Sequence, residues 1–340
     1  MPPQPAVATS LQSRQVMIQY LYLGRVPYSE ALRLQEELVS LRQQDRIGNT
    51  LLLLEHPPVL TLGRNANRSN VLASDELLAA RGVTLHEINR GGDVTYHGPG
   101  QLIGYPIFDL RSLRSPAGGR LGPVDFVRLM EEALIRLCGE FGVPAGRICG
   151  LTGVWCGVLP AIEHFEQQDV SGHDFEPALS LPKGAEKGTK LTRALAPEGP
   201  LGERKIAAIG IHVARGVTSH GFAFNVTTDL HDFALINPCG ITDRPVTTLQ
   251  REVSSTEGLP SLESIAHQAA RQFGLVFNEQ VLALASLDAL RAQAQTSPTA
   301  APDSPTPASP PPQFPAQDTP LQIPPEIDRL RRAKDRPIPA

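Results

Sequence analysis

Apolar and polar residues follow strand-like spacing in several separate segments of the chain. The clearest runs are "VMIQYLYLG" (16–24), "TLLLLEH" and "VLTLGR" on either side of Pro57-Pro58, "QLIGYPIFDL" (101–110) and "TGVWCGV". The longer stretch 204–226 has the pattern of two strands joined around Arg215 and Gly216. These segments predict a protein built largely on β-sheet.

Helical spacing alternates with the strands. The strongest helix is predicted over 123–142, where Cys138 falls among apolar neighbours, and two more are predicted at about 260–273 and 278–293. A further helix is predicted over 29–44, with Ser29 as the N-cap and with Leu34, Leu38 and Leu41 on one face. There is no regular βαβ rhythm, so we predict an α+β fold of mixed sheets with helices packed on them.

Three segments lack this periodicity and set the expected domain boundaries. Residues 296–340 contain 13 of the 32 prolines and are expected to form a disordered tail whose basic end is a solvated terminus or, alternatively, a docking peptide. Residues 1–14 are expected to be flexible. Residues 159–203 resemble a long surface insertion within one catalytic domain that spans 15–295.

Composition excludes several classes of protein. The formal net charge of −4 and the pI near 6.2 give no electrostatic reason to expect binding to nucleic acid or to a membrane surface. The apolar runs are too short to span a bilayer, and the first twenty residues lack a secretory apolar core, so we expect a cytoplasmic protein. The four cysteines form no CxxC pair, which favours neither a disulfide framework nor a metal site.

One cysteine occupies an unusual position. In "NPCGITDRP", Cys239 lies between Pro238 and Gly240, two residues that together specify a tight turn. A free cysteine is more often an inert, buried side chain than a nucleophile, and packing is the expected role of Cys156 in its short strand. Cys239 is therefore a candidate nucleophile that needs support from the rest of the chain.

The stretch "RGGDVTYHGPGQL" (90–102) is dense in residues with special chemistry. Its four glycines would let a ligand lie against the backbone, although the spacing fits neither a P-loop nor GxGxxG. Two tight turns are the alternative interpretation, and His97 alone would more often be structural than catalytic.

Lysine usage singles out a second stretch, "KIAAIGIHV". The chain has five lysines against 26 arginines, and Lys205 is the one that lies in the inferred core. Lysine can change its protonation state when buried, whereas arginine effectively cannot, so Lys205 is a candidate for proton transfer. Chance is the competing explanation.

These motifs, in the order "RGGDVTYHGPGQL", "GVW", "KIAAIGIHVARGVTSHGFAFNV" and "NPCGI", resemble the lipoyl(octanoyl) transferases over roughly 16–290. The resemblance implies a biotin/lipoate protein ligase-like fold with mostly antiparallel sheets. It also implies transfer of an octanoyl group from acyl carrier protein to a lysine of lipoyl domains, in 2-oxoacid dehydrogenase complexes and the glycine cleavage H protein. The segment 159–203 departs from the family, in which this connection is usually short.

The resemblance also assigns site residues. Cys239 corresponds to the acyl-thioester nucleophile and Lys205 to the residue that tunes it, because a nearby ammonium lowers the pKa of a thiol. The walls of the acyl site correspond to Arg90, Gly91, Gly92, Asp93, Val94, Thr95, Tyr96 and His97, to Ala208, Ile209 and Gly210, and to Gly221, Phe222 and Ala223. Lys205, Tyr96 and His97 are all candidates for the base that deprotonates the acceptor lysine. No cofactor or metal is expected, because the donor thioester is already activated, and the expected state is a monomer.

Three other functions remain open from the sequence. An ATP-dependent lipoate or biotin ligase shares the fold but activates a free carboxylate. An amidotransferase that moves lipoyl groups between proteins would also use a cysteine thioester. A non-catalytic lipoyl-domain binder is disfavoured by the presence of both Cys239 and Lys205.

Overall fold

The structure is a computed structural model that describes residues 17–115, 118–158, 202–237, 244–254 and 258–296. Contacts between residues divide the chain into two units, 1–299 and 300–340, and every described residue belongs to the first unit. The predicted flexible N-terminus, nearly all of the predicted insertion and tail, and Cys239 lie outside the described residues.

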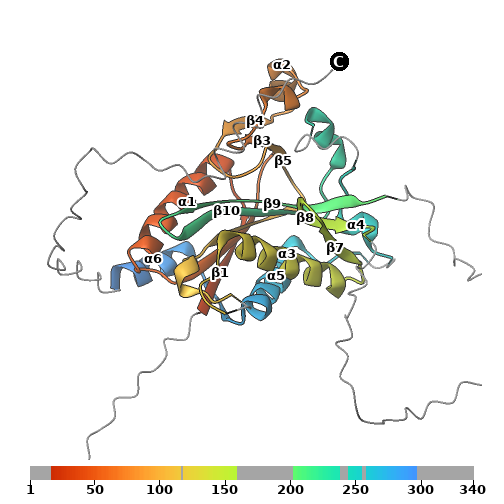
Figure 1. The fold of residues 1–340 in the computed structure, drawn as a ribbon. Helices are drawn as coiled ribbons and strands as arrows, with labels where there is room; N and C mark the ends of the chain where they lie inside the picture. The colour runs from red at the N-terminus through yellow and green to blue at the C-terminus, as the bar shows by residue number, and fades with distance from the viewer. Residues whose placement is uncertain (1–16, 116–117, 159–201, 238–243, 255–257, 297–340) are drawn as a thin grey trace, which may run out of the picture. The chain divides into compact units, whose positions relative to one another are not determined.

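Eight strands form the main sheet, in the order β11, β1, β2, β6, β10, β9, β8, β7. Figure 1 labels β1, β10, β9, β8 and β7 of this sheet. The bounds of the strands are β1 Met17–Arg25, β2 Asn49–Glu55, β6 Gln101–Ile107, β7 Ala145–Ile148, β8 Leu151–Cys156, β9 Arg204–Ala214, β10 Val217–Asn225 and β11 Gln280–Ala283. β1 is parallel to β2 and β11, and the other pairings in this sheet are antiparallel. The predicted mixed, mostly antiparallel α+β fold is confirmed.

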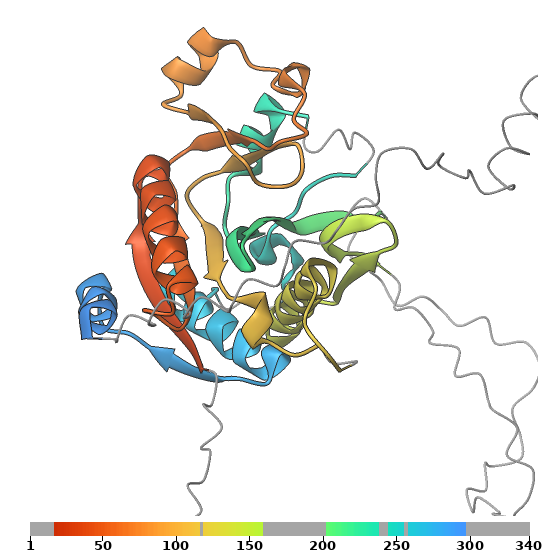
Figure 2. The same cartoon turned by 60° about the vertical axis from the view of Figure 1, so that its left-hand side comes forward.

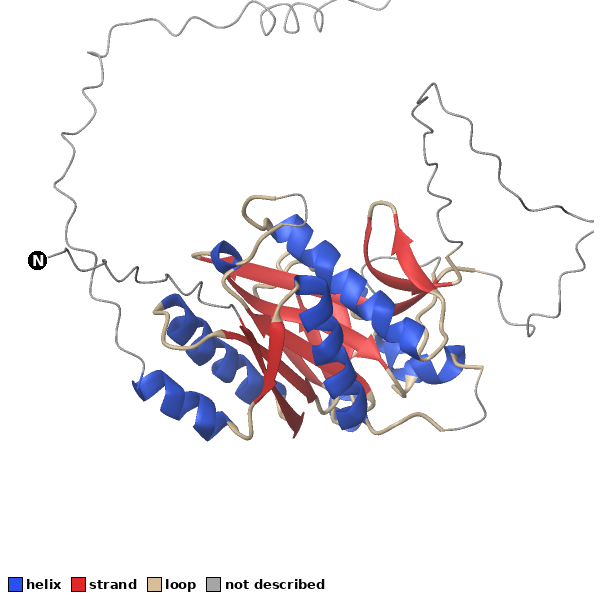
Figure 3. Cartoon of the chain, turned by 90° about the horizontal axis from the view of Figure 1, so that it is seen from below, coloured by secondary structure: helices blue, strands red, loops and turns tan. Residues whose placement is uncertain are grey.

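Helices cover both faces of the main sheet. α3 (Pro123–Glu140) and α5 (Leu262–Phe277) pack side by side on one face, where they bury the largest apolar cluster (Figure 3). α1 (Tyr28–Gln43) and α6 (Leu287–Thr296) contribute to a second cluster on the opposite face. None of the described helices is long and apolar enough to cross a membrane.

The strand β2 explains why the run "LLLL" is apolar throughout. Leu51 and Leu53 pack in the cluster beneath α3 and α5, whereas Leu52 and Leu54 pack in the cluster beneath α1 and α6. Successive side chains of a strand point to opposite faces, so a strand covered on both sides needs apolar residues at every position.

A smaller sheet of three strands, in the order β4, β3, β5, accompanies the main sheet. β3 (Val59–Leu62) is parallel to β4 (Thr84–Glu87) and antiparallel to β5 (Val94–His97). This sheet forms a third apolar cluster with η3 (Leu230–Leu235), and Figure 2 shows η3 beside it. The two strands predicted around Pro57-Pro58 are therefore consecutive in the chain but belong to different sheets.

The remaining helical segments are short. They are η1 (Arg68–Asn70), α2 (Asp75–Ala80), η2 (Leu110–Ser112) and α4 (Leu249–Glu252).

Two details of the predicted helices are wrong. α1 begins at Tyr28 after Pro27, with no side-chain cap, so Ser29 is not the N-cap. A proline before the first turn already provides a backbone angle suited to the helix start. The helix predicted at 278–293 is replaced at its beginning by β11, because Gln280–Ala283 pairs with β1, and α6 starts at Leu287.

Candidate active site

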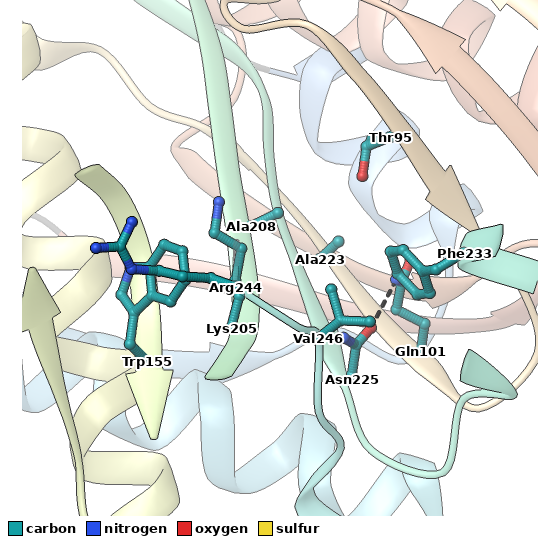
Figure 4. Close-up of a pocket in the computed structure, with 10 residues that line it drawn as sticks. All are labelled: Thr95, Gln101, Trp155, Lys205, Ala208, Ala223, Asn225, Phe233, Arg244 and Val246. Carbon is teal, nitrogen blue, oxygen red and sulfur yellow. Dashed lines mark hydrogen bonds between the residues drawn. The ribbon is translucent and has the colours of Figure 1, made fainter. Parts of the chain in front are cut away.

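Lys205 lines a cavity above β9 and β10 that holds about 450 Å³, part of it open to solvent. Figure 4 shows Lys205, Trp155 and Arg244 grouped together, with Asn225, Gln101 and Phe233 gathered apart from them. The full lining is Thr95, Gln101, Trp155, Lys205, Ala208, Ala223, Asn225, Phe233, Arg244 and Val246.

A β-bulge determines which way Lys205 faces. The pairing of β8 with β9 shifts by one residue, because Val154 pairs with Ala207 whereas Trp155 pairs with Lys205. Ile206 and Ala207 are neighbours in the chain, yet both are buried in the same apolar cluster, the one that α3 and α5 cover. Regular alternation would place Lys205 on the same face as Ala207. The extra residue instead brings Lys205 to the face that carries the cavity.

The chain on either side of Cys239 contributes to this cavity. Phe233 precedes the gap at 238–243 in the described chain, and Arg244 and Val246 follow it. The segment after the gap is bonded to the start of β9, since the Lys205 amide donates to the Pro245 carbonyl at 2.9 Å. The Thr247 amide in turn donates to the Lys205 carbonyl, also at 2.9 Å.

A second cavity, of about 500 Å³ including open solvent, shares Thr95, Ala208 and Ala223 with the first. Its lining also includes Tyr28, Ile88, Arg90, Gly91, Gly92, His97, Tyr105, Ile209, Gly210, His220, Gly221 and Phe222. The shared residues place the two cavities next to each other.

Very small side chains line the floor of the cavities, with Ala208 and Ala223 in both and Gly210 and Gly221 in the second alone. Ala208 pairs with Ala223 and Gly210 pairs with Gly221 across β9 and β10, so the four positions lie together on one face. The backbone carbonyls of Gly91 and Gly104 pack against Gly210 and Gly221 respectively, so the small floor that both cavities share is that of Ala208 and Ala223.

The first glycines of the 90–102 stretch lie directly against β9. The Gly91 amide donates to the Ile211 carbonyl at 3.1 Å. A side chain at Gly210 would approach the Gly91 carbonyl oxygen at 2.8 Å, so only glycine fits there. The Arg90 guanidinium donates to the Thr61 carbonyl at 2.8 Å and so ties this loop to β3.

Successive side chains of β5 point in opposite directions, so the predicted wall residues on this strand fall into two groups. Thr95 and His97 face the cavities, whereas Val94 and Tyr96 are buried in the apolar cluster of the small sheet. The Tyr96 hydroxyl donates to Asp232 at 2.6 Å, and burial raises its pKa.

Asp93 is also outside both cavity linings. Its carboxylate accepts from the Asn67 and Val94 amides and from the Asn70 side chain. The structure thus brings eleven of the fourteen predicted wall residues to the cavities, and Asp93, Val94 and Tyr96 are the three that it places elsewhere.

His97 is a buried, neutral imidazole. Burial lowers its pKa to about 3, and the ring nitrogen Nδ1 lies 2.8 Å from the Gln101 amide oxygen. Gln101 donates in turn to Asn225 at 2.8 Å, and Asn225 donates to the Thr247 carbonyl at 3.0 Å. This chain of hydrogen bonds fixes His97 in place and leaves it a weak base at neutral pH.

The described cysteines differ in exposure. Cys138 and Cys156 are buried, Cys149 is exposed, and burial raises the pKa of Cys156 to about 12. Burial also raises the pKa of Cys138 well above its usual range. Both buried thiols are therefore poor nucleophiles at neutral pH, as packing roles require. Within the described part of the chain, no cluster of His, Cys, Asp and Glu side chains could hold a metal ion.

Several lining residues were not identified from the sequence. Trp155 lies in a predicted strand and in the "GVW" motif, but that motif was not assigned a role in the site. Phe233, Arg244 and Val246 could have been suspected from their closeness to "NPCGI". Gln101 and Asn225 became candidates only when the sheet order placed β6 beside β10.

Comparison with known proteins gives consistent similarities. Residues 27–274 match the lipoyl protein ligase A/B catalytic domain family. The chain is 54% identical to an octanoyltransferase of Acidobacterium capsulatum, over 80% of this chain and 94% of that protein. It is 46% identical to an octanoyltransferase of Koribacter versatilis, over 85% of this chain and 95% of that protein.

Solved structures share the fold at much lower identity. Protein Ta0514 of T. acidophilum, described as a lipoate protein ligase with bound lipoic acid, has a TM-score of 0.50 at 13% identity and covers 82% of this chain and 93% of its own. P. falciparum LipL1, in complex with lipoate, has a TM-score of 0.50 at 10% identity and covers 82% of this chain and 70% of its own. At such identities the likeness concerns the fold alone.

Proposed function

The chain belongs to the lipoyl protein ligase A/B catalytic domain family and is an octanoyltransferase, an acyltransferase of protein lipoylation, and from this premise we propose its substrates and mechanism. We propose that it takes an octanoyl group from acyl carrier protein as a thioester on Cys239. It then delivers that group to a lysine of lipoyl domains, including those of 2-oxoacid dehydrogenase complexes and the glycine cleavage H protein. The reaction takes place in the cytoplasm and involves a monomer.

The observation that carries this proposal is the position of Lys205 beside two small residues. Lys205, Ala208 and Ala223 line the first cavity, and Ala208 and Ala223 also line the second cavity. An octanoyl chain needs a narrow apolar slot, and the amine of Lys205 is then available at the thioester end of that slot.

In the first half-reaction, the thiolate of Cys239 attacks the carbonyl carbon of the donor thioester. The C–S bond to the carrier breaks, and the carrier leaves as a thiolate that takes a proton from the Lys205 ammonium. The products are an octanoyl thioester on Cys239, a carrier thiol and a neutral Lys205 amine. The positive charge of Lys205 favours this step because it stabilises the attacking thiolate.

In the second half-reaction, the neutral Lys205 amine accepts a proton from the incoming lysine ammonium. The resulting amine attacks the Cys239 thioester, an amide forms, the second amine proton passes to solvent and Cys239 leaves as thiolate. A base is needed because a lysine with a pKa of about 10.4 is less than ~0.1% neutral at pH 7.

The other two candidate bases are less suitable. His97 has a pKa of about 3 because it is buried, so it has little affinity for a proton at neutral pH. Tyr96 donates to Asp232 and is absent from the linings of both cavities. These observations support Lys205 as the group that exchanges the proton.

Replacing Lys205 by arginine tests this assignment. Lys205→Arg keeps a positive charge but cannot lose a proton, so it should retain partial acylation of Cys239 and lose transfer to the acceptor by ~10²-fold or more. Lys205→Ala should lose both half-reactions. Rapid-quench kinetics of each half-reaction gives the answer, and full activity of the arginine variant in both steps would refute proton transfer by Lys205.

We further propose that 15–295 is the catalytic domain, interrupted by the insertion at 159–203 and followed by a tail that takes no part in the reaction. The contacts that assign 1–299 to one unit agree with this boundary.

A further inference from the structure

The side chain of Lys205 rests on an aromatic ring. Its amine nitrogen Nζ lies 4.7 Å from the centroid of the Trp155 ring, and the two residues are direct partners in the pairing of β8 with β9. Trp155 is completely buried. A cation above the face of tryptophan is attracted by the electron-rich ring, and the attraction is strongest where water is excluded.

We propose that Trp155 is a positioning residue for acyl transfer, which holds the ammonium of Lys205 over its indole and so directs that group into the cavity. This inference rests on the proposed function of Lys205 and deepens it. Trp155 exchanges no proton itself and acts through Lys205.

The surrounding backbone keeps the pair together. Gly153 leaves the space that the stem of Lys205 needs, since a side chain on Gly153 would lie 3.3 Å from the Lys205 carbon Cε. The Gly153 amide donates to the buried carboxylate of Glu131 on α3 at 3.0 Å. This bond fixes β8 to α3, and the pairing of Trp155 with Lys205 sets the position of β8 relative to β9.

The charged groups around Lys205 are largely engaged with one another. Arg244, which lines the same cavity, pairs with Glu203 at 2.7 Å. Arg204, next to Lys205 in the chain, pairs with Glu252 of α4 at 2.8 Å. On the α3 side, Glu131 is paired with Arg128 and Arg147, and the Cys156 thiol lies on the other face of β8. The neighbouring charged side chains are thus paired with one another, and the neutral ring of Trp155 provides a surface that favours the ammonium of Lys205.

Contact with the indole favours the ammonium over the amine. Trp155 therefore keeps the proton on Lys205 until a leaving thiolate takes it, and it extends the pH range over which Lys205 is charged. Lowering the electron density of the ring, and with it the attraction for the ammonium, should move the alkaline limb of the acylation pH profile to lower pH. The acid limb, which reports the thiol, should stay in place because Lys205 is already protonated there.

Trp155 is the single tryptophan of the chain, which makes a substitution of the ring alone feasible. Incorporating 5-fluorotryptophan and 5,7-difluorotryptophan into the full chain lowers the electron density of the ring with little change of shape. The pH of half-maximal single-turnover acylation on the alkaline limb should fall in that order. Trp155→Leu, which has no ring, should lower it by about 0.5–1.5 pH units, and Trp155→Phe should lie between these limits.

Intrinsic fluorescence provides a second readout that requires no activity. The emission of Trp155 should change as Lys205 loses its proton, with an inflection that moves to lower pH in the fluorinated proteins and vanishes in Lys205→Met. An unchanged inflection and an unchanged alkaline limb across the fluorinated series would overturn the proposal, even if the rate fell. Absence of octanoyl transfer in the parent protein would refute the proposed function instead, and the fluorescence titration would still decide whether the ring holds the ammonium.

Discussion

Replacing Gly153 by alanine probes how closely β8 and β9 pack beside Lys205. The new Cβ would lie 2.6 Å from the Ala207 carbonyl oxygen and 3.3 Å from Cε of Lys205. Gly153 also has a φ of 127°, a backbone conformation that costs ~1–3 kcal/mol for other residues. The contact with a backbone oxygen adds ~1–3 kcal/mol, because the strands must move apart to relieve it. The free energy of unfolding should therefore fall by ~2–6 kcal/mol.

Thermal unfolding of the full chain measures this effect. At ~2–4 °C per kcal/mol for a domain of this size, Tm should fall by ~5–20 °C. Gly146→Ala on the neighbouring strand β7 is the matched control. Its Cβ would meet Val158 at 3.6 and 3.7 Å, which is ordinary contact, so its Tm should change by no more than ~2 °C. The reasoning fails if Gly153→Ala melts as close to the parent protein as the control does.

Two further predictions concern the tail and the buried histidines. Removing 297–340 should leave Tm and transfer to an isolated lipoyl domain nearly unchanged, whereas a loss of rate above tenfold would indicate that the tail docks a partner. Burial lowers the pKa of His56 and His220 to about 4 and that of His97 to about 3, against 6.5 for an unperturbed histidine. The unfolded chain therefore binds more protons below pH 6.5, and the free energy of unfolding should fall by ~1–2 kcal/mol per histidine between pH 7 and pH 5. Urea unfolding at several pH values measures this slope, and a flat profile would contradict the burial of these groups.

The regular elements were predictable because their patterns are local. The helix predicted over 123–142 corresponds to α3, and the two strands predicted on either side of Arg215 and Gly216 correspond to β9 and β10. In β11, by contrast, four residues form a strand only because β1 offers a parallel edge. That pairing joins segments far apart in the sequence, and no local pattern indicates it.

The candidate site was predictable as a set of motifs but not as a geometry. The alternation in "RKIAA" would place Lys205 on the face of Ala207, and the bulge that reverses this depends on the register of β8. The resemblance assigned Tyr96 to the wall together with Thr95 and His97 as one motif, although a strand sends neighbouring side chains to opposite faces. Cys239 lies outside the described residues, so its role rests on the motif and remains a prediction.

Mass spectrometry of the protein after exposure to octanoyl-acyl carrier protein tests the central proposal most directly. The account predicts one added octanoyl group on the peptide that contains Cys239, and little or none in Cys239→Ser. The exposed Cys149 is the internal control for nonspecific acylation, since the thiols of Cys138 and Cys156 are buried. An octanoyl group on Cys149 alone, or transfer to a lipoyl domain that persists in Cys239→Ser, would contradict it.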